Sequence, residues 1–213
     1  MTTVYFIRHG QSVANLAHVF AGHTDVPLTA LGQQQAACTA DFLANVPFSA
    51  FYSSDLRRAY DTGDAVAQQR GMSTNKHVGL REVFAGDWEG LSYSDISRLY
   101  PQNYDVWIHR IGEAVCNNGE SVAQLQQRVS SAVSEIVAQH PNETICIATH
   151  ATPIRVLECL WTNTPLSQMH MIPWVSNASV TIAEYETPNK GALKARDLSE
   201  HLADIVSRNP SSI

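Results

Sequence analysis

The chain has 213 residues, of which 44% are hydrophobic and 16% are charged, and its formal net charge is -6. That length suits one domain with a sizeable core, so we expect a single domain over residues 1–213. No run of Lys and Arg is present, and no segment approaches the roughly 18 apolar residues of a membrane helix, which argues against a nucleic-acid partner and against membrane insertion. The N-terminus lacks the basic and apolar stretches of a secretory signal, so we expect a cytoplasmic location.

The cysteines and histidines show no metal-binding pattern. The four cysteines form no C-x-x-C pair and match no zinc spacing, and most of the histidines are scattered along the chain. Three of the cysteines sit in apolar surroundings, which is typical of buried structural thiols. We therefore expect no metal site and no disulfide framework, as in a reducing compartment.

The chain begins with a strand pattern that leads directly into a charged motif. Residues 4–7 form a short apolar run, which is typical of a buried strand. The run ends at Arg8, His9 and Gly10, where a glycine permits a sharp turn or the close approach of a ligand.

The next elements alternate between helix and strand. Thr29 has the position of an N-cap, and apolar residues at helical spacing follow it as far as Pro47. Residues 48–53 then predict a second strand, and residues 55–67 predict a second helix.

The second half of the chain continues this alternation. Ser121 and Gln124 form a capping-box pattern ahead of an amphipathic helix. Residues 144–149 predict a buried strand, residues 154–161 a helix, and residues 179–185 a last strand. Strands that alternate with helices indicate an α/β domain built around a largely parallel sheet.

One stretch, from about residue 84 to 118, interrupts the alternation and is rich in aromatic side chains. We interpret it either as an insertion that forms a lid over one end of the sheet or as an ordinary connecting helix packed on the core, with equal weight. We predict that the tail after about residue 208 is disordered.

Two predicted strands end in a histidine, one at His9 and the other at His150. In open α/β sheets ligands bind beyond the carboxyl ends of the strands, so both imidazoles face one crevice if the two strands are parallel neighbours. Arg8 precedes the first histidine, and Arg57 and Arg58 open a helix after another strand. Guanidinium groups bind phosphate oxygens two at a time, so this combination indicates a site for a phosphate dianion.

Six motifs carry a family resemblance. Residues 8–15 match R-H-G-x-[ST]-x-x-N and residues 22–32 match G-x-x-D-x-P-L-T-x-x-G; further matches lie at residues 53–62, 80–90, 119–128 and 149–155. In this order the motifs resemble those of the histidine phosphatase superfamily, the phosphoglycerate mutase-like proteins. The resemblance implies a three-layer α/β/α sandwich with a mostly parallel central sheet and a small lid insertion.

The resemblance also implies roles for individual residues. His9 would attack phosphorus and become a phosphohistidine, while Arg8, Arg58 and His150 would hold the transferring group. Glu82 would be the general acid for the leaving oxygen and then the base that activates water. Each of these functions is filled by a protein side chain, so no cofactor or metal is expected.

A second set of residues would bind the substrate phosphate. The resemblance assigns this role to Ser12, Asn15 and the backbone near Ala21 and Gly22. Ala151 stands where many relatives have glycine, so its methyl group would enter the pocket beside the second histidine.

Three functions compete. A phosphatase that hydrolyses a small phosphomonoester is favoured over a cofactor-dependent phosphoglycerate mutase, because a mutase needs extra cations in the lid and residues 84–118 hold only Arg98, His109 and Arg110. Glu82 and His150 are also only 68 residues apart, a short spacing that resembles the phosphatases. A non-catalytic phosphate-binding regulator is disfavoured because all five catalytic positions are intact.

The partner is therefore a small phosphorylated metabolite, and phosphosugars, phosphoserine, α-ribazole phosphate and phosphoglycerates all remain open. The aromatic, weakly basic lid favours a substrate with a neutral or apolar body. A homodimer is possible. We favour a surface position for His23 over contact with the substrate, and packing within the lid for Trp88 and Trp107 over stacking on a ligand. We expect Glu120 to orient one of the phosphate-binding arginines.

Overall fold

The computed structural model describes residues 1–207, and the predicted disordered tail lies outside the described residues. A six-stranded sheet with the order β3-β2-β4-β1-β5-β6 forms the centre of the fold. The strands are β1 (Thr2–Arg8), β2 (Ala50–Ser53), β3 (Thr74–Lys76), β4 (Thr144–Thr149), β5 (Val180–Thr187) and β6 (Lys190–Leu198). Strands β3, β2, β4 and β1 pair in parallel, and β5 pairs antiparallel with both β1 and β6. The predicted, mostly parallel sheet is confirmed.

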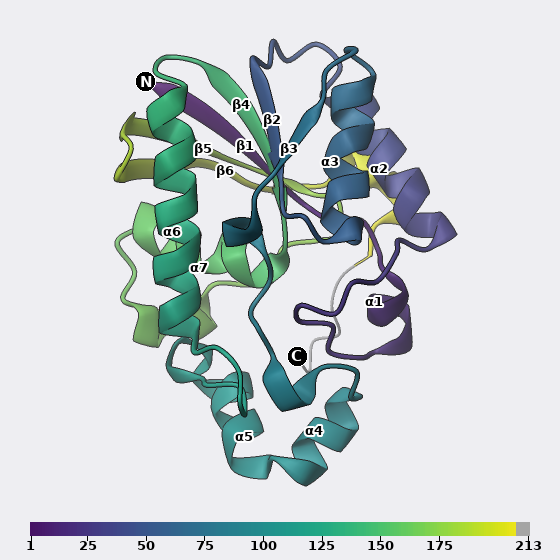
Figure 1. Ribbon diagram of the computed structural model, residues 1–213, viewed down its shortest axis with the longest axis vertical. Helices are drawn as coiled ribbons and strands as arrows, with labels where there is room; N and C mark the ends of the chain where they lie inside the picture. Colours follow the sequence, from purple (N-terminus) through teal and green to yellow (C-terminus); the bar gives the residue numbers. More distant parts are fainter. Residues whose placement is uncertain (208–213) are drawn as a thin grey trace.

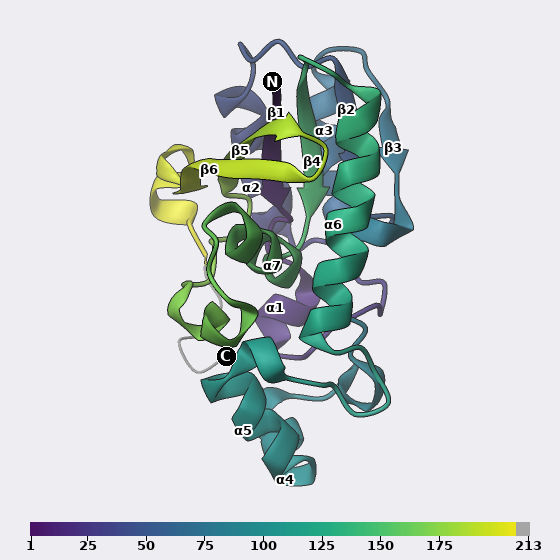
Figure 2. The ribbon, with the colours of Figure 1, turned by 90° about the vertical axis from the view of Figure 1, so that its left-hand side faces the viewer.

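Helices cover both faces of this sheet. Helices α2 (Ala30–Phe42) and α3 (Arg57–Gln68) lie on one face, and α6 (Val122–Gln139) and α7 (Ala151–Trp161) lie on the other (Figures 1 and 2). The three-layer α/β/α arrangement is therefore confirmed. The predicted caps are present as well, because the side chain of Thr29 caps α2 and Ser121 begins α6 with a reciprocal capping box.

The strands hold the layers together through their alternating side chains. Val4 and Phe6 of β1 belong to the core on the α6 and α7 side, whereas Ile7 belongs to the core on the α2 and α3 side. All three side chains are completely buried, and each contributes roughly 1.5–3 kcal/mol through the removal of apolar surface from water. A strand buried on both faces reads as a continuous apolar run, which explains why the sequence predicted it.

Two strands and one helix were not predicted. The missed elements are β3, β6 and the short helix α1 (Val13–Ala17). Both strands are edge strands of the sheet. Their side chains are mostly polar and half-exposed, as is usual at a sheet edge, so they lack the apolar pattern of a central strand.

The aromatic stretch at residues 84–118 contains helices α4 (Tyr93–Leu99) and α5 (Pro101–His109), which lie beyond the end of the sheet at which β1 and β4 finish (Figure 1). Its tryptophans pack as predicted: the rings of Trp88 and Trp107 have centroids 5.8 Å apart, and both also contact Phe20. The stretch is thus anchored to the main core by its aromatic side chains.

Short 3₁₀ helices complete the chain. They are η1 (Val78–Leu80), η2 (Gly86–Trp88), η3 (Ile111–Glu113), η4 (Leu166–Met171) and η5 (Glu200–Ile205). All four cysteines are free, and Cys116, Cys146 and Cys159 are buried, which confirms the prediction of structural thiols. Within residues 1–207, no helix is both long enough and apolar enough to cross a bilayer.

Candidate active site

The two histidines that end predicted strands lie side by side. Strands β1 and β4 are parallel neighbours, and their register pairs Arg8 with Thr149. The next residues are His9 and His150, whose ring centroids are 5.1 Å apart. The backbone N–H of His9 donates to the Thr149 carbonyl at 3.0 Å, which continues the ladder by one residue beyond the strand. The expected crevice at the carboxyl ends of the strands therefore contains both imidazoles.

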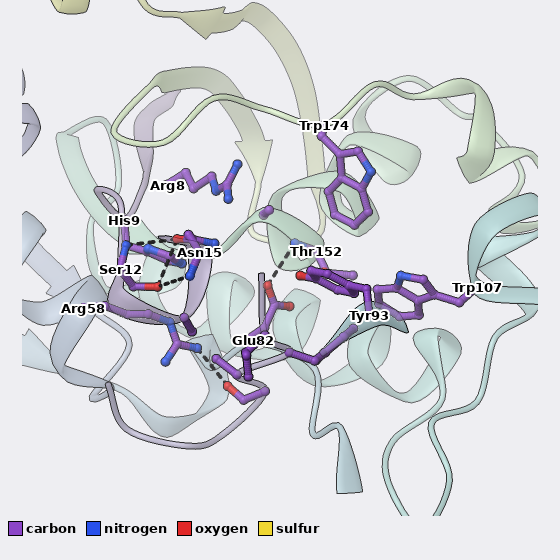
Figure 3. A pocket seen from close by; sticks show the side chains of 16 residues that line it. Arg8, His9, Ser12, Asn15, Arg58, Glu82, Tyr93, Trp107, Thr152 and Trp174 are labelled. Atoms are coloured by element: carbon purple, nitrogen blue, oxygen red, sulfur yellow. Dashed lines mark hydrogen bonds between the residues drawn. The ribbon is translucent and has the colours of Figure 1, made fainter. Parts of the chain in front are cut away.

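A narrow pocket opens at this point; we call it the His9 pocket (Figure 3). Its volume is about 50 Å³, which suits a small group such as a phosphoryl unit. Nine of the ten predicted site residues line it: Arg8, His9, Ser12, Asn15, Ala21, Gly22, Arg58, Glu82 and Ala151. These residues come from five separate segments of the chain, and the fold brings them together.

His9 is held as a neutral imidazole with one free nitrogen. Its Nδ1 lies 2.7 Å from the Gly10 carbonyl oxygen, which can only accept, so Nδ1 carries the proton and Nε2 keeps its lone pair. Burial lowers the pKa of His9 well below its ordinary value, and the charges of Arg58 and Arg8 lower it further. The ring is thus unprotonated near neutral pH.

Two buried guanidinium groups flank this imidazole. Arg8 and Arg58 are each 1% exposed. Nη1 of Arg8 donates to the Val175 carbonyl, and Arg58 donates to the carbonyls of Gly22 and Thr24 at 2.8 and 3.0 Å. Burial lowers the pKa of both arginines to about 10, so both remain charged at neutral pH. The walls of the pocket are therefore cationic and rigid.

Glu82 is the acidic residue of the pocket. Its carboxylate accepts from the backbone N–H of Val83 at 2.8 Å and from that of Thr152 at 3.3 Å. Thr152 lies in the first turn of α7, where unpaired N–H groups favour a negative charge. The Coulombic effect of Glu82 opposes the lowering of the pKa at both Arg8 and Arg58, which indicates that this carboxylate faces both cations.

Arg128 and Glu120 fix the segment that carries Glu82. Arg128 of α6 donates to the carbonyls of Gly79, Arg81 and Glu82 at 2.9–3.0 Å, and Glu120 holds its guanidinium at 2.8 and 2.9 Å. The expectation that Glu120 orients a phosphate-binding arginine is wrong, because its partner is this clamping arginine outside the His9 pocket.

His23 also belongs to this support. Its Nε2 lies 2.8 Å from the Glu82 carbonyl, and its backbone N–H donates to the Glu89 carboxylate. The ring is half-buried, and burial lowers its pKa. The expectation of a plain surface histidine is therefore wrong, since the ring fixes the segment that presents Glu82.

Asn15 presents a donor to the pocket. Its side-chain oxygen accepts from the backbone N–H and the hydroxyl of Ser12, both at 3.0 Å, and from the amide of Asn177 at 3.3 Å. Three donors at one oxygen fix the orientation of the amide, and the NH₂ group is left for a ligand. The Asn177 amide also donates to the His9 carbonyl, so one side chain positions both residues.

Two glycines are required by close contacts. Gly22 has φ +52°, and a Cβ atom there would lie 2.5 Å from the Glu89 carboxylate. A Cβ atom at Gly10 would lie 2.5 Å from the Gly32 carbonyl oxygen, so the close approach predicted at this glycine is made by the chain itself.

His150 lies against the pocket without lining it. Its side chain is completely buried, and its Nε2 lies 2.9 Å from the Ser54 hydroxyl. Its Nδ1 has no hydrogen-bond partner within residues 1–207. Burial lowers its pKa well below the ordinary value, and Arg58 adds to this effect.

Aromatic residues outside the predicted site set also line the pocket. Tyr93, Trp107 and Trp174 line the side of the pocket beyond Glu82, as seen from His9 (Figure 3). Trp174 and Asn177 follow η4 in an irregular segment with no periodicity, so no sequence signal marked them. Among the described residues, no group of three or more His, Cys, Asp and Glu side chains is arranged to hold a metal ion.

The model of the histidine phosphatase superfamily (branch 1) matches residues 4–198 of the chain. The chain therefore belongs to this superfamily. The family expected from the six motifs is confirmed, as is the phosphoglycerate mutase-like fold.

Named relatives support the hydrolase class. Phosphoserine phosphatase 1 of Hydrogenobacter thermophilus is 26% identical over 205 residues, which cover 96% of each chain. Adenosylcobalamin/alpha-ribazole phosphatase of Escherichia coli is 30% identical over 154 residues, which cover 72% of this chain and 76% of the relative.

Solved structures agree over nearly the whole chain. YhfR of Bacillus stearothermophilus has a TM-score of 0.90 and 31% identity, and the match covers 95% of this chain and 100% of that one. A mycobacterial glucosyl-3-phosphoglycerate phosphatase in complex with VO3 has a TM-score of 0.85 and 27% identity, with 92% and 99% of the two chains covered.

Proposed function

We propose that this protein is a metal-independent phosphatase that hydrolyses a small phosphomonoester through a phosphohistidine intermediate on His9. The observation that carries the proposal is the state of that imidazole: it is neutral, its Nδ1 proton is held by the Gly10 carbonyl, and its Nε2 lone pair lies among two buried guanidinium groups. A phosphate dianion repels nucleophiles, so a neutral nucleophile among fixed positive charges suits this reaction.

The proposed reaction has two steps. In the first, Nε2 of His9 attacks phosphorus, the ester P–O bond breaks, and Glu82 gives its proton to the leaving oxygen. In the second, Glu82 takes a proton from water as the water oxygen attacks phosphorus, and the P–N bond breaks to release phosphate. Arg8, Arg58 and His150 stabilise the transferring group, and Ser12, Asn15 and the backbone at Ala21 and Gly22 complete its binding site.

A hydrolase fits the lid better than a phosphoglycerate mutase does. A mutase retains a bisphosphorylated intermediate and needs further cations around the pocket. The three basic residues counted in the aromatic stretch are exposed and paired with local acids: Arg98 with Asp95, His109 with Asp105, and Arg110 with Glu113. None of them lines the His9 pocket, so none of them is placed to bind a second phosphate there.

The test is phosphate release from a panel of phosphomonoesters, including the substrates that the relatives' names suggest: phosphoserine, α-ribazole phosphate and glucosyl-3-phosphoglycerate. We expect His9→Ala to lower kcat by at least about a thousandfold, as is usual when a nucleophile is removed. His109→Ala, an exposed histidine outside the pocket, is the matched control and should leave kcat unchanged.

Incubation of 3-phosphoglycerate with a bisphosphate primer separates the two reactions, because a mutase returns 2-phosphoglycerate whereas the proposed phosphatase returns inorganic phosphate. Turnover of the panel by His9→Ala at the rate of the parent would exclude the mechanism.

A further inference from the structure

A second cavity lies next to the His9 pocket. Its volume is about 210 Å³, four times that of the first by the same measure. We call it the Arg155 cavity, and it is lined by Trp107, Ile108, Ile111, Arg155, His170, Ile172, Pro173 and Trp174. Trp107 and Trp174 line both spaces, and both indoles lie on the far side of Glu82 from His9 (Figure 3). The leaving group of a bound ester would extend in this direction, since Glu82 protonates the leaving oxygen.

Two of the residues that line this cavity each carry a buried donor that has no acceptor. These donors are Nη1 of Arg155 and Nε1 of Trp107, and neither has a hydrogen-bond partner within the described part of the chain. Their side chains are 3% and 2% exposed. A buried donor without a partner is rare and costs free energy. Two such donors on residues that line one cavity indicate that a bound ligand supplies the acceptor.

The guanidinium of Arg155 is fixed in place. Its Nε and Nη2 donate to the carbonyls of Met169 and Ile172 at 2.6–3.0 Å, and its central carbon lies 3.9 Å from the centre of the Trp174 ring. These contacts use Nε and Nη2 and fix the guanidinium, so Nη1 alone remains for a ligand in the cavity that Arg155 lines.

The positive charge of Arg155 has no ion-pair partner of its own among the described residues, although Glu158 and Glu82 attract it through space. No carboxylate within residues 1–207 forms an ion pair with it, and the neighbouring Glu158 is paired with Arg196 instead. Burial lowers the pKa of Arg155 to about 10, so the group is still a cation at neutral pH. A water molecule would accept the hydrogen bond but would bring no negative charge, whereas an anion supplies both.

We propose that the Arg155 cavity binds a carboxylate on the leaving group of the substrate, which makes Arg155 and Trp107 specificity-determining residues. Two donors match the two oxygens of a carboxylate, and one guanidinium matches its single charge. A second phosphate would bring about two charges to one cation. The other walls are apolar and suit a short carbon chain between phosphate and carboxylate.

This inference rests on the proposed phosphatase function and changes the expected substrate. The sequence favoured a substrate with a neutral or apolar body, because residues 84–118 contain few cations. Arg155 enters from α7, outside that stretch, and the fold brings it to the lid.

The test uses pairs of substrates that differ only in the carboxylate. A series of ω-phosphooxyalkanoates of three to six carbons is compared with the alkanediol monophosphates of the same lengths, so the leaving oxygen changes little within a pair. At the best length we expect the carboxylate to raise kcat/KM by at least about tenfold, the effect of one hydrogen bond to a charged group.

Three variants show which residues cause the preference for the carboxylate. Arg155→Met should abolish the preference, measured as the ratio of kcat/KM between the carboxylate and the alcohol of each pair, so that a change in the rate common to both substrates cancels. Trp107→Phe, which removes one donor and keeps a ring, should reduce the preference several-fold. Arg98→Met, an exposed arginine on α4, is the matched control and should retain it. If Arg155→Met does not fold, the Trp107→Phe variant decides the assignment.

No preference at any chain length in the wild type, or a preference retained by both Arg155→Met and Trp107→Phe, overturns the proposal. Calorimetry with the non-hydrolysable phosphonates of the same pairs gives a second readout. If neither member of any pair is hydrolysed but the carboxylate still tightens phosphonate binding in an Arg155-dependent way, the proposed chemistry has failed and the carboxylate site stands.

Discussion

At the scale of single residues, the proposed mechanism gives Glu82 two tasks, as the acid for the leaving oxygen and as the base for water. Its carboxylate faces Arg8 and Arg58 and accepts from the backbone at the start of α7. A general acid matters most when the leaving oxygen is a poor leaving group, because a stable leaving anion departs without a proton.

We therefore predict that Glu82→Gln lowers kcat/KM for an alkyl phosphate by about 10²- to 10⁴-fold. The loss with p-nitrophenyl phosphate should be at least about tenfold smaller, because nitrophenolate needs no proton. Steady-state kinetics with both esters measure the difference, and Glu186→Gln, an exposed carboxylate paired with Lys190, is the control. Equal losses for the two esters would contradict the role as acid.

The residue scale also shows what a motif can and cannot predict. Arg57 and Arg58 are adjacent, and only the motif alignment distinguished them in the sequence. In the structure Arg58 is 1% exposed and lines the pocket, whereas Arg57 pairs with Asp61 at the surface. Asn177 supports Asn15 and His9 from a segment without any pattern, and only the fold could reveal it.

At the scale of elements, helix α6 acts on the site from a distance. Its Arg128 holds three of the last four carbonyls of the segment that ends in Glu82, and Glu120 fixes the guanidinium. Hydrogen bonds to charged groups contribute roughly 1.5–3 kcal/mol each, so this clamp determines the position of the carboxylate. We interpret Arg128 as a positioning residue.

We predict that Arg128→Met lowers kcat/KM for alkyl phosphates by roughly 10²-fold, because an error of about 1 Å in a catalytic group has this effect. Inhibition by inorganic phosphate should be unchanged, since the phosphate-binding residues are not touched, and Arg128→Lys should restore part of the rate. Arg98→Met controls for loss of a surface charge. A purely structural role would instead weaken phosphate inhibition and lower kcat together.

The elements that the sequence predicted are those buried on both faces. Central strands such as β1 and β4 read as apolar runs, and the caps at Thr29 and Ser121 marked helix starts. Edge strand β6 is mostly half-exposed and carries Lys190 and Lys194 toward solvent, so it gave no such signal. The Arg155 cavity was not foreseeable, because it depends on α7, α5 and η4 meeting in space.

At the scale of the whole molecule, the buried histidines link stability to pH. Burial lowers the pKa of both His9 and His150 well below the ordinary value near 6.5. Below that value the unfolded chain binds protons that the folded chain does not bind. Acid therefore favours unfolding, and stability rises as the pH rises toward 6.5.

We predict that the free energy of unfolding falls as the pH falls from about 6.5 to 5, by up to about 1.4 kcal/mol per pH unit for each such histidine. Urea unfolding at several pH values measures this slope. His9→Asn should make the slope shallower by about one proton's contribution, and His170→Asn, at an exposed position, is the matched control. Identical slopes for the wild type and His9→Asn would show that His9 is not held neutral by the fold.

The central claim, that His9 carries the phosphoryl group, is tested most directly by trapping the intermediate. Glu82→Gln slows attack by water, so with p-nitrophenyl phosphate the phosphorylated enzyme should accumulate. After quenching in denaturant without acid, mass spectrometry should find one phosphoryl group on His9, and none in the double variant that also carries His9→Ala. Turnover by Glu82→Gln with no phosphoryl group on His9, or with the group on another residue, would contradict the account.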